Sequence, residues 1–211
     1  MDQLSPAGRL ANTFWVMRHG QSKANASGII VSSIERDRRG DFGLTELGRE
    51  QVLAAAGGCA LPAGTVICSS DFARARQTAE IVRDCLGAPG VVLAPALRER
   101  YFGDFDGSPV SNYPRVWAAD EAGAACGGVE PVAAVLDRMA GFVSELERSY
   151  RGRDILLVSH GDPLQILQAG LAGTDPSRHR DLPPLQTAEI RALLAGGGVT
   201  PPPPDGRVTP P

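Results

Sequence analysis

The sequence predicts an α/β fold with a largely parallel sheet that helices cover on both faces. Short apolar runs, each the length of a buried strand, alternate along the chain with longer segments of helical periodicity. Two of these strands end in the same dipeptide, His19-Gly20 and His160-Gly161. Because such sheets bind ligands outside the carboxyl ends of their strands, we expect the two imidazoles to meet at one edge.

The first elements follow from local signals. Residues 13–20 are an apolar run that ends in Arg-His-Gly, which predicts a strand. Residues 21–42 are polar and irregular, so we expect a loop whose charged segment 35–39 lies on the surface. Thr45 is the predicted N-cap of a helix that ends at Gly57-Gly58.

The middle of the chain continues the alternation. The apolar run 65–69 predicts a second strand, and Ser70 or Asp71 is the predicted cap of the helix that follows. This helix is expected to end near Leu86-Gly87 and to be followed by a short strand over 91–93. Residues 97–128 are rich in glycine and predict mainly loop, with a helical turn near Trp117.

The last elements include the longest predicted helix, which starts at Pro131. Its apolar residues recur at steps of three and four and define one buried face: Val132, Val135, Leu136, Met139, Phe142, Val143 and Leu146. A fourth strand is predicted over 154–159, and a helix over 163–172. Residues 188–194 predict a final strand, although a helix is the alternative.

Composition places the chain among globular proteins, with one domain over 13–195. Residues 1–12 are expected to be a flexible leader, and the Gly- and Pro-rich segment 196–211 a disordered tail. A net charge of −3 without a basic run gives no nucleic-acid footprint. The four cysteines show no metal-ligand spacing, and no segment is apolar enough to span a bilayer. We therefore expect a cytoplasmic protein with reduced thiols; nothing indicates its oligomeric state.

Arg18-His19-Gly20 is the first candidate for chemistry. A packed or exposed histidine is the usual explanation of such a tripeptide alone. The functional interpretation is a nucleophile, since a neutral imidazole can attack phosphorus. Arg18 would favour the neutral ring and bind phosphate, while Gly20 would let its N–H approach an oxyanion. Ser22 and Asn25 follow as possible neutral donors.

Three further segments could complete a phosphate site. Arg74 lies in the first turn of a predicted helix that itself offers N–H groups to an anion. Glu99 could be a general acid whose pKa is raised beside a phosphate dianion. If His160 stands beside His19, it can be protonated and stabilise developing charge. His179, between two arginines, is expected at the surface.

In this order the segments resemble the histidine phosphatase superfamily, the phosphoglycerate mutase-like clan. The matching stretches are 18–25, Leu44-Thr45 with Gly48 and Gln51, Ser69-Ser70 with Arg74-Ala75 and Thr78-Ala79, Leu97 with Glu99, Phe102-Gly103 and Gly107, and 159–161. The resemblance covers residues 14–194. It implies a three-layer α-β-α sandwich with a mixed, mostly parallel sheet.

The resemblance also implies roles for individual residues. His19 would be the phosphorylated histidine, His160 the second active-site histidine, and Glu99 the proton donor. Arg18 and Arg74 would bind the phosphate. The remaining predicted substrate-binding residues are Gly20, Gln21, Ser22, Asn25, Gly161 and Tyr101. No metal or other cofactor is implied, and the expected partner is a small phosphorylated metabolite.

The family contains phosphatases and mutases. Its mutases carry a sizeable insertion between the glutamate and the second His-Gly, whereas Glu99 to His160 is short here. The stretch 25–45 also lacks the Trp-Asn pair expected of a mutase. An open pocket lets water reach a phosphohistidine, which favours hydrolysis and predicts a phosphatase. The alternatives are a phosphoglycerate mutase and a non-catalytic module that binds phosphorylated partners.

Overall fold

The computed structural model describes residues 10–193, which form a five-stranded sheet in the order β3-β2-β4-β1-β5. Four strands run parallel: β1 (Thr13–Arg18), β2 (Val66–Ser69), β3 (Val91–Leu93) and β4 (Asp154–Ser159). The fifth, β5 (Ile190–Leu193), pairs antiparallel with β1. The predicted α/β class with a mixed, mostly parallel sheet is confirmed, including a strand within residues 188–194.

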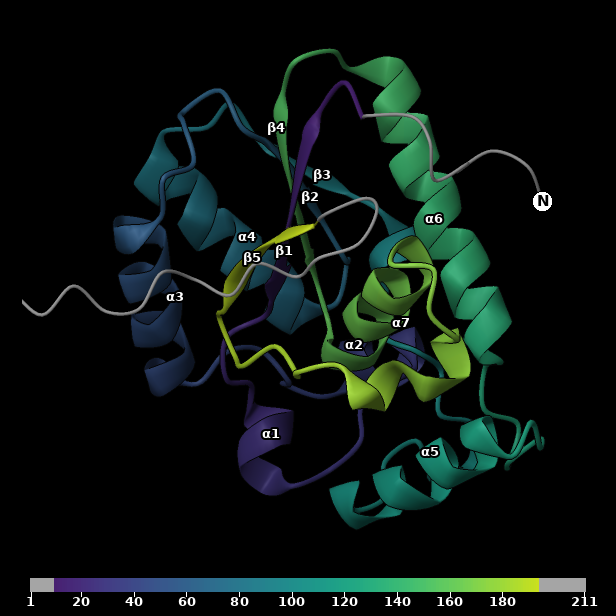
Figure 1. The fold of residues 1–211 in the computed structure, drawn as a ribbon. Coiled ribbons are helices and arrows are strands. Elements are labelled where there is room, and N and C mark those ends of the chain that lie inside the picture. The colour runs from purple at the N-terminus through teal and green to yellow at the C-terminus, as the bar shows by residue number, and fades with distance from the viewer. Residues whose placement is uncertain (1–9, 194–211) are drawn as a thin grey trace, which may run out of the picture.

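Helices cover both faces of this sheet (Figure 1). The pair α3 (Glu46–Gly58) and α4 (Ala73–Leu86) lies on one face, and α6 (Val132–Ser149) with α7 (Gly161–Leu171) on the other. The alternation of strand side chains creates both interfaces. Phe14 and Val16 of β1 belong to the cluster around α6 and α7, while Met17 belongs to the cluster around α3 and α4.

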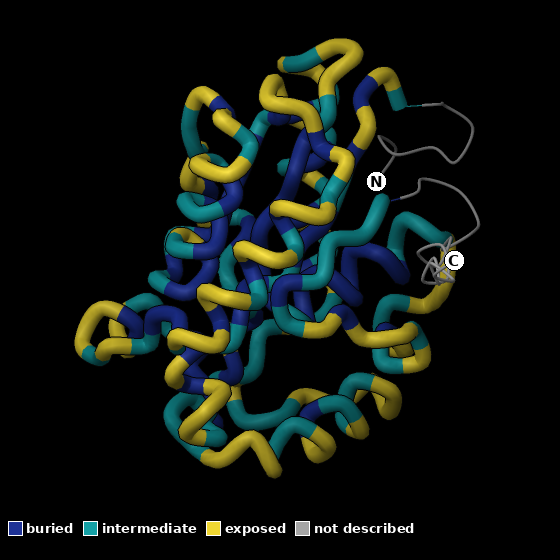
Figure 2. Tube along the Cα trace, turned by 90° about the vertical axis from the view of Figure 1, so that its left-hand side faces the viewer, coloured by how far each residue is buried: buried dark blue, intermediate teal, exposed yellow. Residues whose placement is uncertain are grey.

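The buried residues gather along the sheet and its flanking helices, with exposed residues on the outer surfaces (Figure 2). On α6 the buried side chains are Val135, Met139, Val143 and Leu146, which confirms the predicted apolar face. Together the two helix layers and the sheet make the expected three-layer sandwich. Within the described part of the chain, no helix is long and apolar enough to cross a membrane.

Three helices lie beyond the carboxyl ends of the strands, where loops were predicted: α1 (Lys23–Ser27), α2 (Ile34–Arg39) and α5 (Tyr113–Glu121). Short 3₁₀ turns accompany them at 95–97, 103–105 and 110–112, and a longer one covers 176–181. The loop predictions for 21–42 and 97–128 were therefore wrong in part. Helices this short have no stable periodic face of their own and depend on caps and tertiary packing. Ser22 and Ser33 supply the caps of α1 and α2.

The first residues of the helices show which N-cap predictions were correct. Thr45 caps α3 as predicted, accepting a hydrogen bond from Gly48 N–H. The predicted caps Ser70 and Asp71 were wrong, since α4 starts at Ala73 and Phe72 occupies its N-cap position. A residue from another helix replaces them: Asp37 Oδ2 of α2 accepts a hydrogen bond of 2.9 Å from Ala73 N–H.

The boundary of the predicted leader also needs correction. Residues 1–9 lie outside the described residues, as does the predicted tail, 196–211. Asn12, however, is buried and donates through Nδ2 to Glu147 Oε2 at 2.7 Å and to the Tyr150 carbonyl at 2.8 Å. Residue 12 is therefore attached to the end of α6 and is part of the folded unit.

Gly20 makes a close contact that predicts a large stability effect. A Cβ at this position would lie 2.5 Å from the Gly48 carbonyl oxygen and 2.8 Å from Val52 Cγ2. We expect Gly20→Ala to lower the free energy of unfolding by about 1–3 kcal/mol, measured by urea denaturation. Gly57→Ala on α3 is the control: its Cβ meets nothing within 4 Å, so it should be neutral or stabilising. Equal effects of both variants would contradict this packing role.

Candidate active site

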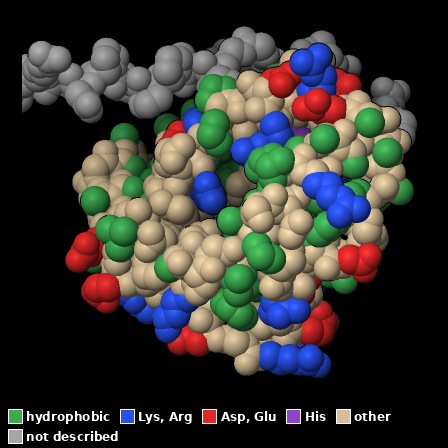
Figure 3. Space-filling model, turned by 90° about the horizontal axis from the view of Figure 1, so that it is seen from below, with side chains coloured by type: hydrophobic (Ala, Val, Ile, Leu, Met, Phe, Trp, Pro, Cys, Tyr) green, Lys and Arg blue, Asp and Glu red, His purple; other side chains and the backbone are tan. Residues whose placement is uncertain are grey.

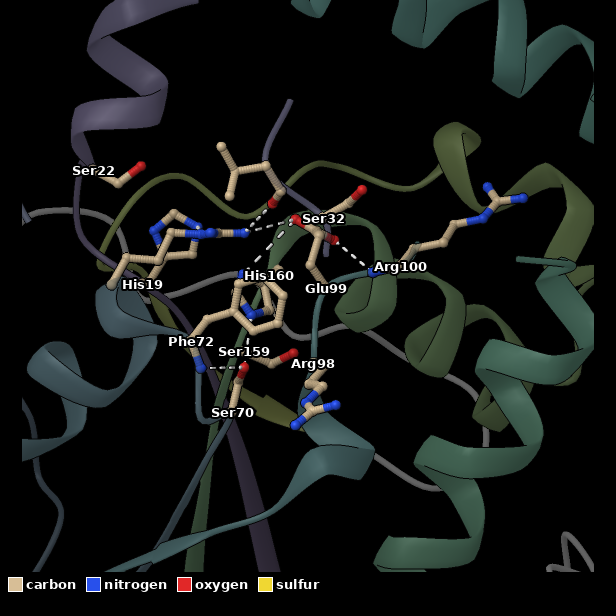
Figure 4. A network of polar contacts seen from close by, with 12 residues as sticks. His19, Ser22, Ser32, Ser70, Phe72, Arg98, Glu99, Arg100, Ser159 and His160 are labelled. Atoms are coloured by element: carbon tan, nitrogen blue, oxygen red, sulfur yellow. Dashed lines mark hydrogen bonds and ion pairs between the residues drawn. The ribbon is translucent and has the colours of Figure 1, made fainter. Parts of the chain in front are cut away.

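The two His-Gly dipeptides meet because their strands are neighbours in matching register. Arg18, the last residue of β1, pairs in parallel with Ser159, the last residue of β4. The next residues are His19 and His160, whose ring centroids lie 5.2 Å apart at an interplanar angle of 64° (Figure 4). The prediction that two distant imidazoles converge at one edge is confirmed. The same face of the molecule is hollowed, with Lys and Arg side chains near the hollow (Figure 3).

His19 is held in a defined orientation. Its Nδ1 lies 2.7 Å from the Gly20 carbonyl oxygen, and its Nε2 lies 3.1 Å from Arg74 Nε. A carbonyl accepts and a guanidinium donates, so the proton is assigned to Nδ1 and the lone pair to Nε2. Burial lowers the pKa of His19 well below its usual value, and the charges of Arg74 and Arg18 lower it further. His19 therefore presents a neutral ring with a basic Nε2.

Arg74 and Arg18 bring positive charge to the histidines. Arg74 is 3% exposed, donates through Nη2 to the Val31 carbonyl at 2.9 Å, and lies 3.7 Å from Glu99 Oε2. Arg18 donates through Nη1 to the Leu185 carbonyl at 2.9 Å. Within residues 10–193, the buried atoms Arg74 Nη1 and Arg18 Nε have no hydrogen-bond acceptor. Buried donors without acceptors are costly, and here they suit an anion.

Glu99 lies beside His160 (Figure 4), and its Oε2 is 3.7 Å from Arg74 Nη2. Its Oε2 is 3.7 Å from His160 Nδ1, and its Oε1 accepts from Arg100 N–H at 3.0 Å. Burial raises the pKa of Glu99 to about 7, Arg74 opposes the shift, and Asp162 adds to it. From the sequence, a bound phosphate was the expected cause of a raised pKa at Glu99. The structure produces the same direction through desolvation, so a substantial fraction of Glu99 is protonated near neutral pH.

His160 differs from the expectation in its charge. Its Nε2 lies 2.9 Å from Ser70 Oγ, and the ring is fully buried. Burial lowers the pKa of His160 well below its usual value, and Arg74 and His19 lower it further. The expected protonated ring is therefore not the favoured form in this structure, because desolvation and the nearby arginines, Arg74 foremost, outweigh the nearby carboxyl group.

Several predicted substrate-binding groups have structural partners. Gly20 N–H donates to Thr78 Oγ1 at 3.1 Å, so this N–H is not free for an oxyanion as expected. Gln21 accepts through Oε1 from the Thr45 hydroxyl at 2.7 Å, which attaches it to the start of α3. Ser22 and Asn25 form the capping box of α1. Asn25 Oδ1 serves as acceptor in this box, which leaves its amide nitrogen as the group that could donate to a substrate.

Gly161 and Tyr101 lie on different sides of the site. Gly161 is the first residue of α7, and a Cβ there would lie 3.6 Å from Arg18 Cζ and Nε, so this backbone borders the arginine. Tyr101 is 47% exposed and lines a cavity of about 460 Å³. Of the five predicted catalytic residues, this cavity reaches Glu99.

The sequence interpretation missed a buried polar cluster beside the site. His179, expected at the surface, is fully buried, with Nε2 3.4 Å from Asp162 Oδ1. Asp162 also accepts from Trp117 Nε1 at 3.1 Å and from Arg100 Nη1 at 3.3 Å. Arg100 in turn forms two bonds of 2.7 Å with Asp120. The arginines flanking His179 suggested exposure, but the Pro176 carbonyl, 3.0 Å from its Nδ1, and the nearby Asp162 carboxylate allow burial.

Ser70 and Tyr113 are further residues that the interpretation did not assign to the site. Ser70 followed a predicted strand, which was the signal that could have identified it as the partner of His160. Tyr113 is stacked on Trp117, and the charges of Glu99, Asp162, Arg74 and Arg18 all act on its pKa, which burial raises. Among the described residues, no group of three or more His, Cys, Asp or Glu is arranged to hold a metal ion.

Comparisons with known proteins match the chain to one family and one fold. A model of the histidine phosphatase superfamily (branch 1) matches residues 14–200. The chain is 33% identical over 172 residues to a glucosyl-3-phosphoglycerate phosphatase of Mycolicibacterium vanbaalenii, covering 75% of this chain and 73% of the relative. It is 30% identical to a probable phosphoglycerate mutase of Yersinia enterocolitica, covering 80% and 78%. Among solved structures, a mycobacterial glucosyl-3-phosphoglycerate phosphatase with VO3 superposes with a TM-score of 0.71, at 28% identity, covering 85% and 91%.

Proposed function

The chain belongs to the histidine phosphatase superfamily, and on that premise we propose that it hydrolyses small phosphomonoesters through a phosphohistidine formed on His19. The catalytic domain, expected from the sequence over residues 13–195, is proposed to begin already at Asn12. The observation that carries the proposal is the state of His19, whose Nδ1 is committed to the Gly20 carbonyl. Its Nε2 lone pair is directed toward Arg74 and is the nucleophile that this chemistry requires.

The first step is attack of His19 Nε2 on phosphorus. An N–P bond forms, the bond from phosphorus to the ester oxygen breaks, and the Glu99 proton passes to that oxygen. Arg18, whose buried Nε has no acceptor in the described structure, and Arg74 hold the phosphoryl oxygens. A phosphate dianion beside His160 opposes the effect of the arginines on its pKa and favours the protonated ring. That ring then stabilises charge on the transferring group.

The second step is hydrolysis of the phosphohistidine. Glu99, now ionised, accepts a proton from water, whose oxygen attacks phosphorus as the N–P bond breaks. Inorganic phosphate leaves, His19 regains its lone pair and Glu99 its proton. Neither step needs a redox partner. The cavity that reaches Glu99 is the proposed place for the leaving group, with Tyr101 at its wall.

Mutase activity is the second candidate function, and the short segment between Glu99 and His160 argues against it. The structure uses this segment for α5 and α6, which leaves no further insertion there to close over a bisphosphate. With 47% of Tyr101 exposed, the cavity at Glu99 has access to water. Access of water favours hydrolysis over return of the phosphoryl group to a second acceptor.

A substrate panel tests the proposed function. Purified protein is incubated with p-nitrophenyl phosphate and with sugar and glycerate phosphates in the presence of EDTA, and inorganic phosphate is measured. We expect phosphate release that EDTA does not change. A parallel assay follows interconversion of 3-phosphoglycerate with and without a bisphosphate primer. Interconversion that outpaces phosphate release would identify a mutase, and no release from any ester between about pH 5 and 8 would contradict the proposal.

A further inference from the structure

Asp37 is a buried carboxylate that neither the catalytic steps nor the sequence interpretation uses. The sequence placed it in a charged surface segment, yet it is 6% exposed on α2. Its Oδ2 accepts from Ala73 N–H at the start of α4, directly before Arg74. Phe72, at the N-cap position, offers this helix no side-chain acceptor. One oxygen of Asp37 therefore has a structural role, as the cap of the helix that carries Arg74.

Within residues 10–193, the other oxygen of Asp37 has no hydrogen bond. Oδ1 is buried and lies 3.8 Å from Arg74 Nη1, a buried donor that also has no partner in the described structure. Hydrogen-bonded atoms of these types lie near 2.9 Å, so the two are separated by about 1 Å too much. A buried acceptor and a buried donor that face each other unbonded cost free energy that a small shift would recover.

The guanidinium group of Arg74 also forms a hydrogen bond with the nucleophile, His19. Its Nε donates to His19 Nε2 at 3.1 Å. This hydrogen bond occupies the lone pair that must attack phosphorus, so Arg74 Nε has to leave before the N–P bond can form. Movement of the guanidinium toward Asp37 would release Nε2 and at the same time satisfy both unbonded atoms.

We propose that Asp37 is a positioning residue for Arg74, which receives the guanidinium through Oδ1 when Arg74 Nε leaves His19 Nε2. This inference rests on the proposed function, because it concerns the release of the same nucleophile. Asp37 acts through Arg74 and does not itself touch the substrate. Burial raises the pKa of Asp37, whereas Ala73 N–H and Arg74 lower it, with Asp71 and Arg76 as further charges nearby. A closer Arg74 would stabilise the ionised carboxylate that the proposed contact needs.

Asp37→Asn separates the two roles of this side chain. Asparagine keeps one oxygen for Ala73 N–H and places its uncharged NH2 group, a donor, beside the Arg74 donor, so the negative charge and the second acceptor are both lost. We expect kcat for p-nitrophenyl phosphate to fall by about 10- to 100-fold, with a thermal midpoint close to that of the wild type. In an Arg74→Lys background, which lacks Nη1, the same change should have little further effect. Asp37→Ala, which removes the cap as well, should also lower the thermal midpoint.

The matched control is Asp175→Asn. Asp175 caps the 3₁₀ segment 176–181 by accepting from Ser177 N–H at 2.9 Å, outside the site, so kcat should not change. Two results would show that Asp37 is a helix cap and nothing more. One is a wild-type kcat in Asp37→Asn. The other is a fall in kcat that adds in full to the fall caused by Arg74→Lys.

A crystal structure with inorganic phosphate tests the movement without turnover. We expect Arg74 Nη1 within hydrogen-bond distance of Asp37 Oδ1, and Arg74 Nε more than 3.5 Å from His19 Nε2. Phosphate bound with Arg74 Nε still on His19 would overturn the Asp37 inference and leave the proposed function standing. A wild-type enzyme that neither binds phosphate nor releases it from esters would instead remove the proposed function, and the inference with it.

Discussion

Replacing His19 by alanine is expected to lower kcat for phosphomonoesters by about 10⁴-fold or more, because the attacking lone pair is removed. Among the described residues, no neighbour of His19 offers an equivalent nucleophile. The other imidazole, His160, has Nε2 engaged with Ser70 Oγ at 2.9 Å and Nδ1 facing Glu99. The measurement is steady-state release of phosphate, with circular dichroism to confirm that the variant is folded.

The covalent intermediate supplies a second readout for the same variant. A ³²P-labelled substrate quenched during turnover should leave label that is stable to base and lost in acid, as expected for a phosphohistidine. We expect the label on the wild type and not on His19→Ala. His179→Asn is the control, since this buried histidine contacts Asp162 outside the reacting group. Label that persists in His19→Ala would contradict the assignment of the nucleophile.

Replacing Glu99 by glutamine should produce the second-largest effect, and the effect should depend on the leaving group. For an alkyl phosphate, whose alkoxide is a poor leaving group, loss of the general acid is expected to lower kcat by about 10²–10⁴-fold. For p-nitrophenyl phosphate the loss should be much smaller, since p-nitrophenolate departs without a proton. Comparing kcat for both esters in the wild type and the variant measures this. Equal losses would indicate that Glu99 has a structural role.

The pH dependence of the wild type follows from the same carboxyl group. Burial raises the pKa of Glu99 to about 7, and the protonated form is the acid. Activity toward alkyl phosphates should therefore decline as the pH rises through about 7, and this decline should be absent in Glu99→Gln. At low pH, activity should fall because His19 becomes protonated. Since the pKa of His19 is lowered, this fall should occur at a lower pH than for an ordinary histidine. Glu80→Gln, on the exposed side of α4, should keep the wild-type profile.

Strong local signals in the sequence predicted most of the sheet and its covering helices. Each parallel strand was a short apolar run, and α6 carried four buried residues at helical spacing. The short helices α1, α2 and α5 were missed because their apolar residues are too few to show a period. Their stability comes from packing, as with Val116 of α5, which lies in a cluster with Ile30 and Phe102.

Side-chain burial was the property that sequence patterns misjudged near the site. Asp37 and His179 both stand among arginines in the sequence, which suggested exposed charge. In the fold each meets a partner from another element: Ala73 N–H of α4 for Asp37 and Asp162 of α7 for His179. A charged group can be buried when such a partner exists, and the partner belongs to the topology.

The sequence by itself determined which groups reach the edge of the sheet, because a buried apolar run followed by His-Gly places an imidazole at the end of a strand. Adjacency was left to the tertiary structure: β1 and β4 had to pair in the register Arg18 to Ser159 before His19 and His160 could stand 5.2 Å apart. The tertiary structure also decided the protonation states of the site residues. The pKa values of His19, His160 and Glu99 depend chiefly on desolvation, and what excludes water from each group is contributed by segments far from it in the chain.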